Sequence, residues 1–268
     1  MRKSTREEGA MTMKTLSAQQ AEIPVLGLGT WQMKGKTCQR TVREALEMGY
    51  RHIDTAQMYR NEDRVGSAVK NSSVPRDEIF ITTKLLPKNL AYEDVLSTYE
   101  ESRNRLQTDY VDLLLIHSPS RSVPIEESIN AMNRLQEESK VRHIGVSNFS
   151  VRQTREAMDA SATPIVTNQV RYHPYYGQEE LLKFCQEEDL ILTAYSPLGR
   201  GRVASDNTLQ EIGKSHGKTA VQVALKWLFQ QDRVIVIPKA STTEHLRENM
   251  EIFDFSLTDT EMDRIYNL

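Results

Sequence analysis

His52-Ile53-Asp54-Thr55-Ala56-Gln57-Met58-Tyr59 begins as a short strand and ends as a loop. The stretch places a carboxylate, Asp54, near the end of the strand and a phenol, Tyr59, five residues later. A free phenol has a pKa of about 10, which is too high for easy proton donation at neutral pH. A nearby cation favours the phenolate and makes the phenol a usable general acid. The next predicted strand ends in such a cation, Lys84.

Around this stretch, strand-like and helix-like segments alternate about eight times along the chain, as in α/β proteins. Strands are predicted over residues 23–31, 52–56, 79–84, 110–117, 141–148, 165–172, 190–197 and 234–238. Helices are predicted over residues 38–49, 61–71, 92–106, 125–139, 150–160, 178–188, 207–216, 219–230 and 243–251, and a last one is capped by residues 256–259. The nearly continuous apolar run at 110–117 is typical of a strand buried on both faces of a parallel sheet. The pattern predicts a (β/α)₈ or TIM barrel.

A doubly wound sheet is the alternative α/β fold. Against it, the stretch from Gly27 to Gln32 lacks the third glycine of the dinucleotide-binding fingerprint, and no phosphate-binding loop is present. No linker or low-complexity segment interrupts the chain. We therefore expect one barrel domain over residues 14–268, preceded by a disordered tail over residues 1–13.

Composition excludes several classes of protein. The 268 residues carry a net charge of −3 with scattered basic residues, which gives no case for binding nucleic acid or an acidic membrane. The apolar runs are too short to span a bilayer, and the polar start lacks the apolar core of a signal peptide. Cys38 and Cys185 match no metal spacing and are expected to be reduced. We expect a monomeric, cytoplasmic protein.

Polar or aromatic residues stand at nearly every predicted strand end, whereas the strand middles are apolar. The end residues are Trp31, Asp54, Lys84, His117, Ser147, Asn148, Gln169, Tyr195, Ser196 and Lys239. Active sites of barrels form at the C-terminal ends of the strands. The chance placement of so many polar groups at one mouth is improbable, so we expect an active site there.

The chemistry that suits these groups is carbonyl reduction. Tyr59 is expected to donate a proton to the carbonyl oxygen while hydride arrives at the carbon. Lys84 is expected to lower the pKa of the phenol, Asp54 to hold the ammonium, and His117 to orient the small-molecule carbonyl substrate. No amino acid side chain supplies hydride, so a nicotinamide cofactor is required.

Three other readings compete with reduction. Lys84 at a barrel strand end also suits a Schiff-base aldolase. His52 and Asp54 resemble a metal ligand pair of a hydrolase, although His52 begins its strand and should point away from the mouth, so we assign no metal site. A catalytically weak subunit that senses NADPH and binds a partner is the third.

The ordered motifs resemble those of the aldo-keto reductase family across nearly the whole chain past the first twenty residues. They are Leu26-Gly27-Leu28-Gly29-Thr30-Trp31, Asp54-Thr55-Ala56 with Tyr59, Lys84, His117, Gly145-Val146-Ser147-Asn148-Phe149, Asn168-Gln169, Tyr195-Ser196-Pro197-Leu198-Gly199 and Ile237-Pro238-Lys239. The resemblance implies a (β/α)₈ oxidoreductase that reduces aldehydes or ketones with NADPH. It also implies the catalytic set Asp54, Tyr59, Lys84 and His117.

The resemblance further implies how the cofactor is held. Ser147, Asn148 and Gln169 would bind the nicotinamide carboxamide, and Tyr195 would stack on the ring. The segment from Ser196 to Gly199 would follow the pyrophosphate. The remaining implied cofactor residues are Gly29, Thr30, Trp31, Asp54, Ile237, Pro238, Lys239, Ala240, Ser241, Thr242, His245, Glu248 and Asn249.

Two positions depart from the family pattern near the adenosine 2′-phosphate. Ala240 stands where a serine is frequent, and His245 stands where an arginine is frequent. On a helix, Arg247 points about 200° away from position 245, so it is a poor substitute. Losing a guanidinium weakens phosphate recognition. We still expect NADPH, because Lys239 remains and Ser241 or Thr242 can donate, with better use of NADH than is usual for the family.

Substrate choice is expected to be broad. The segments between His117 and Pro124 and between Gly199 and Asn207 are short, which predicts an open site. The chain resembles compact microbial members that reduce 2,5-diketo-gluconate, methylglyoxal and aromatic aldehydes. The expected substrate contacts are Trp31, Met58, Tyr59 and His117, with Trp31 and Met58 as apolar walls.

Overall fold

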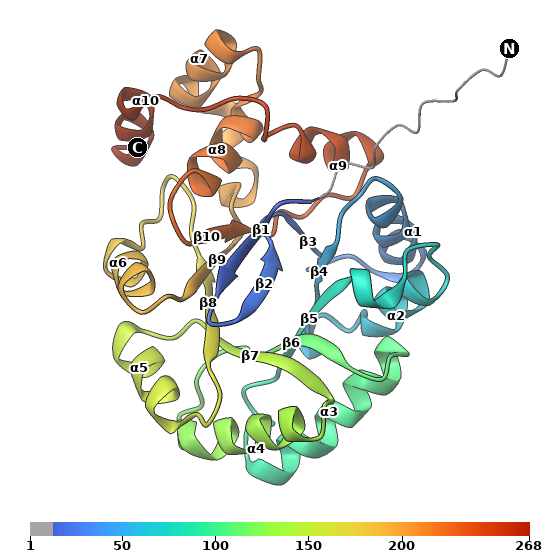
Figure 1. The fold of residues 1–268 in the computed structure, drawn as a ribbon. Helices are drawn as coiled ribbons and strands as arrows, with labels where there is room; N and C mark the ends of the chain where they lie inside the picture. Colours follow the sequence, from blue (N-terminus) through green and yellow to red (C-terminus); the bar gives the residue numbers. More distant parts are fainter. Residues whose placement is uncertain (1–12) are drawn as a thin grey trace, which may run out of the picture.

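Eight parallel strands form a closed barrel in the computed structural model, which describes residues 13–268 (Figure 1). The strands, each hydrogen-bonded to the next, are β3 (Gly27–Gly29), β4 (His52–Asp54), β5 (Phe80–Leu85), β6 (Val111–Ile116), β7 (Val141–Ser147), β8 (Ile165–Arg171), β9 (Ile191–Tyr195) and β10 (Val234–Val236). A parallel bridge between Leu26 and Val236 joins the last strand to the first, and the Gly29 amide donates to the Pro238 carbonyl at 3.0 Å. This closure confirms the predicted barrel and rules out an open sheet.

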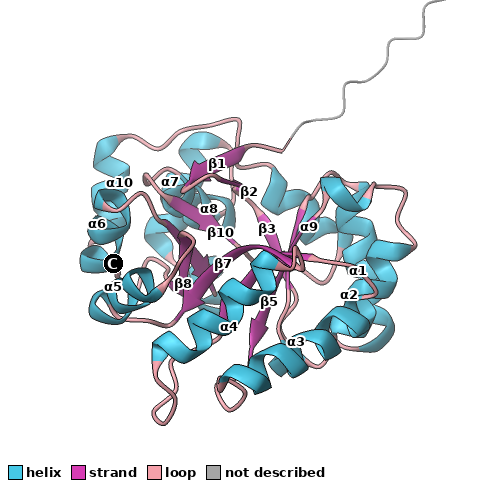
Figure 2. Cartoon of the chain, turned by 60° about the horizontal axis from the view of Figure 1, so that its bottom comes forward, coloured by secondary structure: helices cyan, strands magenta, loops and turns pink. Residues whose placement is uncertain are grey.

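The helices cover the outside of the strands (Figure 2). They are α1 (Gly35–Glu47), α2 (Glu62–Lys70), α3 (Tyr92–Leu106), α4 (Ile125–Glu137), α5 (Val151–Ala160), α6 (Glu179–Glu187), α7 (Asn207–His216), α8 (Ala220–Phe229), α9 (Thr243–Met250) and α10 (Asp259–Tyr266), with 3₁₀ turns η1 (Gln57–Tyr59), η2 (Arg76–Glu78) and η3 (Gly199–Ser205). Their apolar faces pack on the outward side chains of the strands in one large core. Within residues 13–268, no helix has both the length and the apolarity needed to cross a membrane.

The prediction at the start of the barrel was wrong. Residues 23–31 do not form one strand, because Ala21–Pro24 (β2) pairs with Thr15–Ala18 (β1) in an antiparallel hairpin and only Gly27–Gly29 enters the barrel. Both turn residues, Gln19 and Gln20, have positive φ, at 47° and 67°. Such turns normally contain Asn or Gly. Here the Gln19 amide is held by the carboxylate of Asp189 at 3.0 Å, a contact that local sequence does not signal.

The hairpin closes the N-terminal end of the barrel (Figure 1). Its Ala18, Ala21 and Ile23 pack against inward-facing strand residues such as Leu113 and Ile235 in a second apolar cluster. Residues 1–12 of the predicted tail lie outside the described residues, whereas Met13 is already partly buried against the core. The opposite end carries the C-terminal ends of the strands, where the active sites of barrels form.

Asn61 connects two of the loops at that open end. It occupies the N-cap position of α2, but its side chain does not cap the helix. Its amide instead donates to the carbonyls of Thr30 and Met33, at 2.9 and 3.1 Å, and its oxygen accepts from the Thr55 hydroxyl at 2.7 Å. These buried bonds tie the loop after β3 to the loop after β4.

His52 lies inside the barrel, and its burial predicts that the stability of the protein depends on pH. The ring is buried, its Nε2 is 3.0 Å from the Thr82 hydroxyl, and burial lowers the pKa of His52 to about 4. The unfolded chain has a histidine pKa of about 6.5 and therefore binds the proton first as the pH falls. Stability should drop by roughly 2 kcal/mol between pH 8 and pH 5 from this group alone.

The measurement is the unfolding free energy of wild type and His52→Gln by urea titration across that pH range. The substitution lowers stability at every pH, but only wild type should show the added slope between pH 5 and pH 8. Parallel curves for the two proteins would contradict the assignment of this titration to His52.

Candidate active site

A cavity of about 240 Å³ opens at the C-terminal ends of the barrel strands. Most of the predicted site residues line it. They are Gly29, Trp31, Asp54, Met58, Tyr59, His117, Ser147, Asn148, Gln169, Tyr195, Ser196, Ile237 and Lys239. Trp31 and Met58, the predicted apolar walls, are 40% and 48% exposed, so they are not ordinary core residues. The polar strand ends thus meet where the sequence placed them.

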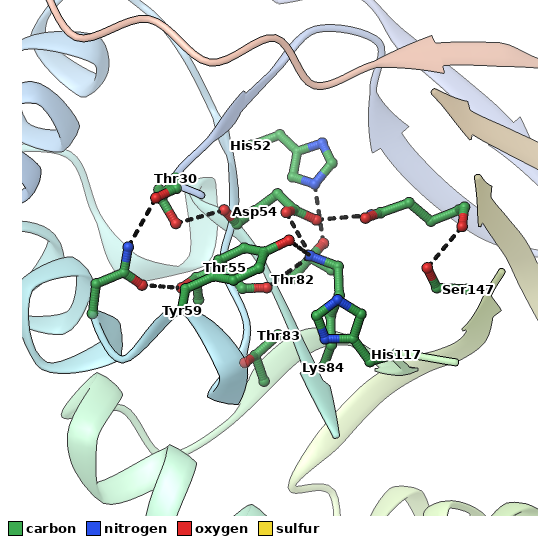
Figure 3. Close-up of polar contacts among 12 residues, drawn as sticks. Thr30, His52, Asp54, Thr55, Tyr59, Thr82, Thr83, Lys84, His117 and Ser147 are labelled. Carbon is green, nitrogen blue, oxygen red and sulfur yellow. Dashed lines mark hydrogen bonds and ion pairs between the residues drawn. The ribbon is translucent and has the colours of Figure 1, made fainter. Parts of the chain in front are cut away.

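Lys84 has a fully buried ammonium and contacts two of the other three predicted catalytic residues, Asp54 and Tyr59 (Figure 3). Its Nζ donates to Asp54 Oδ1 at 2.5 Å and to the Thr55 carbonyl at 2.8 Å. The hydroxyl of Tyr59 lies 3.4 Å from the same nitrogen. Strand β5 and the 3₁₀ turn η1 therefore bring the phenol beside the ammonium. Tyr59 belongs to the lining of the cavity, whereas Lys84 does not.

The direction of the phenol's pKa differs from our expectation. Burial raises the pKa of Tyr59 well above its ordinary value, and the neighbouring Asp54 and Tyr195 add to the rise. Burial also lowers the pKa of Lys84, against the opposing effect of Asp54. The ammonium is thus largely matched by Asp54 and does not make the resting phenol acidic. Tyr59 stays protonated at neutral pH, which is the form that a proton donor needs.

His117 stands against the ring of Tyr59 and is uncharged at neutral pH. The two ring centroids are 5.8 Å apart in an edge-to-face arrangement. Burial, together with the ammonium of Lys84, lowers the pKa of His117 to about 4. Its Nδ1 is buried without a hydrogen-bond partner among the described residues. A buried N–H without an acceptor is costly, so the proton belongs on Nε2, which can donate to a ligand.

A hydrogen-bonded floor continues from Asp54 to the neighbouring strands. Gln169 Nε2 donates to Asp54 Oδ2 at 2.8 Å, and Ser147 Oγ donates to the Gln169 carbonyl at 2.7 Å. Asn148 donates to the His117 carbonyl at 2.8 Å and accepts from the Tyr195 hydroxyl at 2.9 Å. β4, β7, β8 and β9 are therefore joined beneath the cavity by side chains as well as by the sheet.

Other predicted cofactor residues lie outside the cavity lining. They are Thr30, Pro197, Leu198, Gly199, Pro238, Ala240, Ser241, Thr242, His245, Glu248 and Asn249. Thr30, Ala240 and Asn249 are buried, whereas Thr242 caps the start of α9, where its hydroxyl accepts from the His245 amide. Cofactor contacts by these residues remain predictions.

His245 and Arg247 face different hollows on the surface of α9. His245 and Glu248 line one together with Lys218, whereas Arg247 lines another beside Met48. This agrees with the prediction, from helical geometry, that Arg247 points away from position 245.

Two arginines of the cavity were missed from the sequence. Arg171 follows Gln169 by two residues on β8, so both project from the same face of the strand. Arg200 directly follows Gly199 and lies with its guanidinium 5.8 Å from the centre of the Trp31 ring. The two-residue periodicity of β8 could have identified Arg171. Arg200 gave no such signal, because its backbone has a left-handed conformation in η3, with φ of 57°.

The competing readings find little support in this geometry. Lys84 does not line the cavity, which separates its amine from any carbonyl carbon there. His52 also lies away from the cavity and contacts Thr82, as its place in the strand predicted. Among the described residues, no group of three or more His, Cys, Asp or Glu side chains is arranged to hold a metal ion.

The chain is similar over most of its length to known reductases. It is 40% identical to the 9,11-endoperoxide prostaglandin H2 reductase of Trypanosoma cruzi over 250 residues, which cover 92% of this chain and 88% of the relative. It is 40% identical to the glyoxal reductase of Bacillus subtilis over 246 residues, 91% and 88% of the two chains. The crystal structure of a candidate 2,5-diketo-D-gluconic acid reductase B superposes with a TM-score of 0.94 at 46% identity, covering 96% and 92% of the two chains.

The family model of the aldo/keto reductase family matches residues 25–268, which span every barrel strand and every residue of the cavity. The relatives and the match support carbonyl reduction with a nicotinamide cofactor. The barrel, the site at its open end and the sequence match agree with one another, and this chain belongs to the aldo-keto reductase family of oxidoreductases.

Proposed function

We propose that this protein reduces aldehydes and ketones to alcohols with NADPH, and less well with NADH, and that Tyr59 is the proton donor. The observation that carries the proposal is the position of Tyr59, which lines the cavity and whose hydroxyl lies 3.4 Å from a fully buried ammonium. The expected substrates are small aldehydes, 2-oxoaldehydes and diketo sugar acids.

Each of the four groups has a separate task. His117 donates a hydrogen bond from Nε2 to the carbonyl oxygen and fixes its position. Tyr59 transfers its proton to the same oxygen, and Lys84 stabilises the phenolate that remains, because the attraction of a cation at this distance in a buried site strengthens as charge develops. Asp54 keeps the ammonium in place at 2.5 Å. General acid catalysis of this kind contributes roughly 10²–10⁴-fold.

The residues of the cavity fit a nicotinamide dinucleotide. Within residues 13–268, Gln169 Oε1 has no hydrogen-bond donor, which leaves an acceptor for a carboxamide N–H beside Ser147 and Asn148. Lys239 and Arg200 line the cavity without a carboxylate partner in that part of the chain, so they can meet phosphates. When bound, the cofactor supplies the hydride that no side chain can supply.

The openness of the cavity mouth determines which substrates can enter. Trp31 and Met58 are 40% and 48% exposed and leave the mouth open, so the cavity gives little steric selection. The names of the relatives, a glyoxal reductase and a candidate diketo-gluconic acid reductase, support dicarbonyl substrates for this chain as well. The test is a panel of aldehydes, diketones and keto sugars assayed with NADPH and with NADH. Absence of cofactor oxidation with every carbonyl compound would refute the proposal.

Replacing His245 with arginine should improve the use of NADPH. His245 is exposed beside Lys214 and Lys218, and a guanidinium there offers a forked donor to the 2′-phosphate. The KM for NADPH in His245→Arg should fall roughly 10-fold, while that for NADH stays the same. Arg247→His, on the other side of α9, is the matched control and should change neither value. An equal gain for both cofactors would exclude recognition of the 2′-phosphate at this position.

We also propose a monomeric cytoplasmic enzyme. Cys38 and Cys185 are both buried and unpaired with each other, and burial raises the pKa of each thiol to about 12, which keeps them unreactive. Size-exclusion chromatography with light scattering tests the monomer, and a mass of two chains would overturn it.

A further inference from the structure

Positive charge without a counterion lines the cavity. Arg171, Arg200 and Lys239 belong to the lining, and none of them pairs with a carboxylate of the described residues. The one carboxylate of that lining is Asp54, which is bound to Lys84 at 2.5 Å. His117 is neutral and adds no further charge. A cavity with three unmatched cations attracts anions, and its apolar walls strengthen the attraction.

The cofactor accounts for only part of this charge. Lys239 follows the last strand, and Arg200 follows the segment expected along the pyrophosphate, so both have a place on the proposed cofactor path. Arg171 has none. It projects from β8 on the same face as Gln169, which reaches Asp54 at 2.8 Å, while Val170 between them packs into the outer core. Arg171 therefore lies at the mouth above the catalytic groups.

The position of Arg171 is fixed by contacts that leave its positive charge unpaired. Its backbone pairs with Tyr195 of β9, and its carbonyl accepts from Gln178 Nε2 at 2.9 Å. Its guanidinium lies 5.4 Å from the centre of the Tyr176 ring, a contact that orients the group but leaves its N–H donors available. The side chain is only partly buried, so a ligand in the cavity can reach it.

The surroundings of Arg171 are also basic. Arg202 lies over the ring of Tyr175 at 3.8 Å, and the nearby His173 has a lowered pKa caused by burial, by Arg171 and by Arg202. Two acids lie in this region: Asp206 accepts from the Tyr175 hydroxyl at 3.0 Å, the carboxylate of Glu179 lies beside Gly177, and neither forms an ion pair with Arg171. The fork of donors on Arg171 therefore has no protein partner among residues 13–268.

We propose that the cavity selects carbonyl substrates that carry a second, anionic group, a carboxylate or a phosphate, and that Arg171 binds this group. The inference rests on the proposed reductase function and names its substrate class. A guanidinium matches both anions with two parallel hydrogen bonds. Arg171 is thus a specificity-determining residue, whereas the reacting carbonyl is handled by Tyr59 and His117.

The experiment compares matched substrates with the full chain and NADPH. The carboxylate arm uses 4-carboxybenzaldehyde against benzaldehyde, and the phosphate arm uses glyceraldehyde 3-phosphate against glyceraldehyde. In at least one arm, wild type should show a kcat/KM roughly 10- to 100-fold higher for the anionic compound, mostly through KM. The arm with the larger ratio identifies the anion.

Three variants locate the effect. Arg171→Met should abolish the preference for the anionic substrate and leave the neutral substrate and the KM for NADPH unchanged. Arg171→Lys keeps the charge but not the fork, so it should restore part of the preference. Arg202→Gln removes the same charge outside the cavity lining and should leave the preference intact.

The outcomes separate this inference from the proposed function. Equal kcat/KM for anionic and neutral compounds in wild type overturns the inference while the reductase function stands. A raised KM for NADPH in Arg171→Met also overturns it, because Arg171 would then serve the cofactor. If Arg202→Gln lost the preference to the same extent as Arg171→Met, direct binding of the anion by Arg171 would be overturned. The preference would then come from the overall positive potential of the region. Failure to reduce any carbonyl compound refutes the function itself.

Discussion

Tyr59→Phe is expected to lower kcat by roughly 10²–10⁴-fold, the contribution of a positioned general acid. The substitution removes one oxygen from a side chain that keeps its ring, its edge-to-face contact with His117 and its place in η1. The fold and the cofactor site should therefore survive. The measurement is the rate of NADPH oxidation with a saturating aldehyde, together with the KM for NADPH, which should not change.

Tyr266→Phe is the matched control, because that phenol lies exposed on α10 and outside the cavity. It should keep the rate of wild type. Full activity in Tyr59→Phe would show that another group donates the proton. Loss of activity accompanied by loss of cofactor binding would point instead to a structural role for the hydroxyl.

The raised pKa of Tyr59 fixes the sign of its pH dependence. A general acid works in its protonated form and is lost as the pH rises through its pKa. Because burial, Asp54 and Tyr195 all raise that pKa, the loss should begin only at strongly alkaline pH. The reduction rate should consequently show no decline from this group across the neutral range.

The candidate site could be placed from the sequence because the chemistry of a barrel is concentrated at its strand ends. Asp54, Lys84 and His117 are polar residues that follow apolar strands, and parallel strands that close into a barrel bring such ends together. The same rule gave Ser147 and Gln169. The fold was predictable for a related reason, since the alternation of short apolar strands with amphipathic helices admits few arrangements.

Features that depend on distant contacts were not predictable. The turn at Gln19 and Gln20 is stabilised by Asp189, which is 170 residues away in the sequence. The direction of the Tyr59 pKa is set first by burial and then by Asp54 and Tyr195, and the sequence contains no measure of burial. Arg171 was predictable, by contrast, because it stands two residues after Gln169 in the same strand and therefore projects from the same face.

Lys84→Met is expected to damage both stability and catalysis. The ammonium is fully buried and donates to Asp54 and to the Thr55 carbonyl, so its removal leaves a buried carboxylate whose remaining side-chain donor is Gln169. Breaking a buried ion pair by removing one partner costs about 3–5 kcal/mol. The phenolate of Tyr59 also loses its stabilising charge, which should lower kcat by roughly 10²–10³-fold. Urea unfolding and steady-state kinetics measure the two effects.

The double variant Asp54→Asn/Lys84→Met separates these effects. Removing both charges eliminates the uncompensated carboxylate, so the double variant should be more stable than Lys84→Met alone. Its kcat should stay low, because no cation stands beside the Tyr59 hydroxyl. If activity returned together with stability, the ammonium would act only by holding the fold. If stability returned without activity, its charge would be part of the proton transfer itself, as the 3.4 Å separation from the phenol suggests.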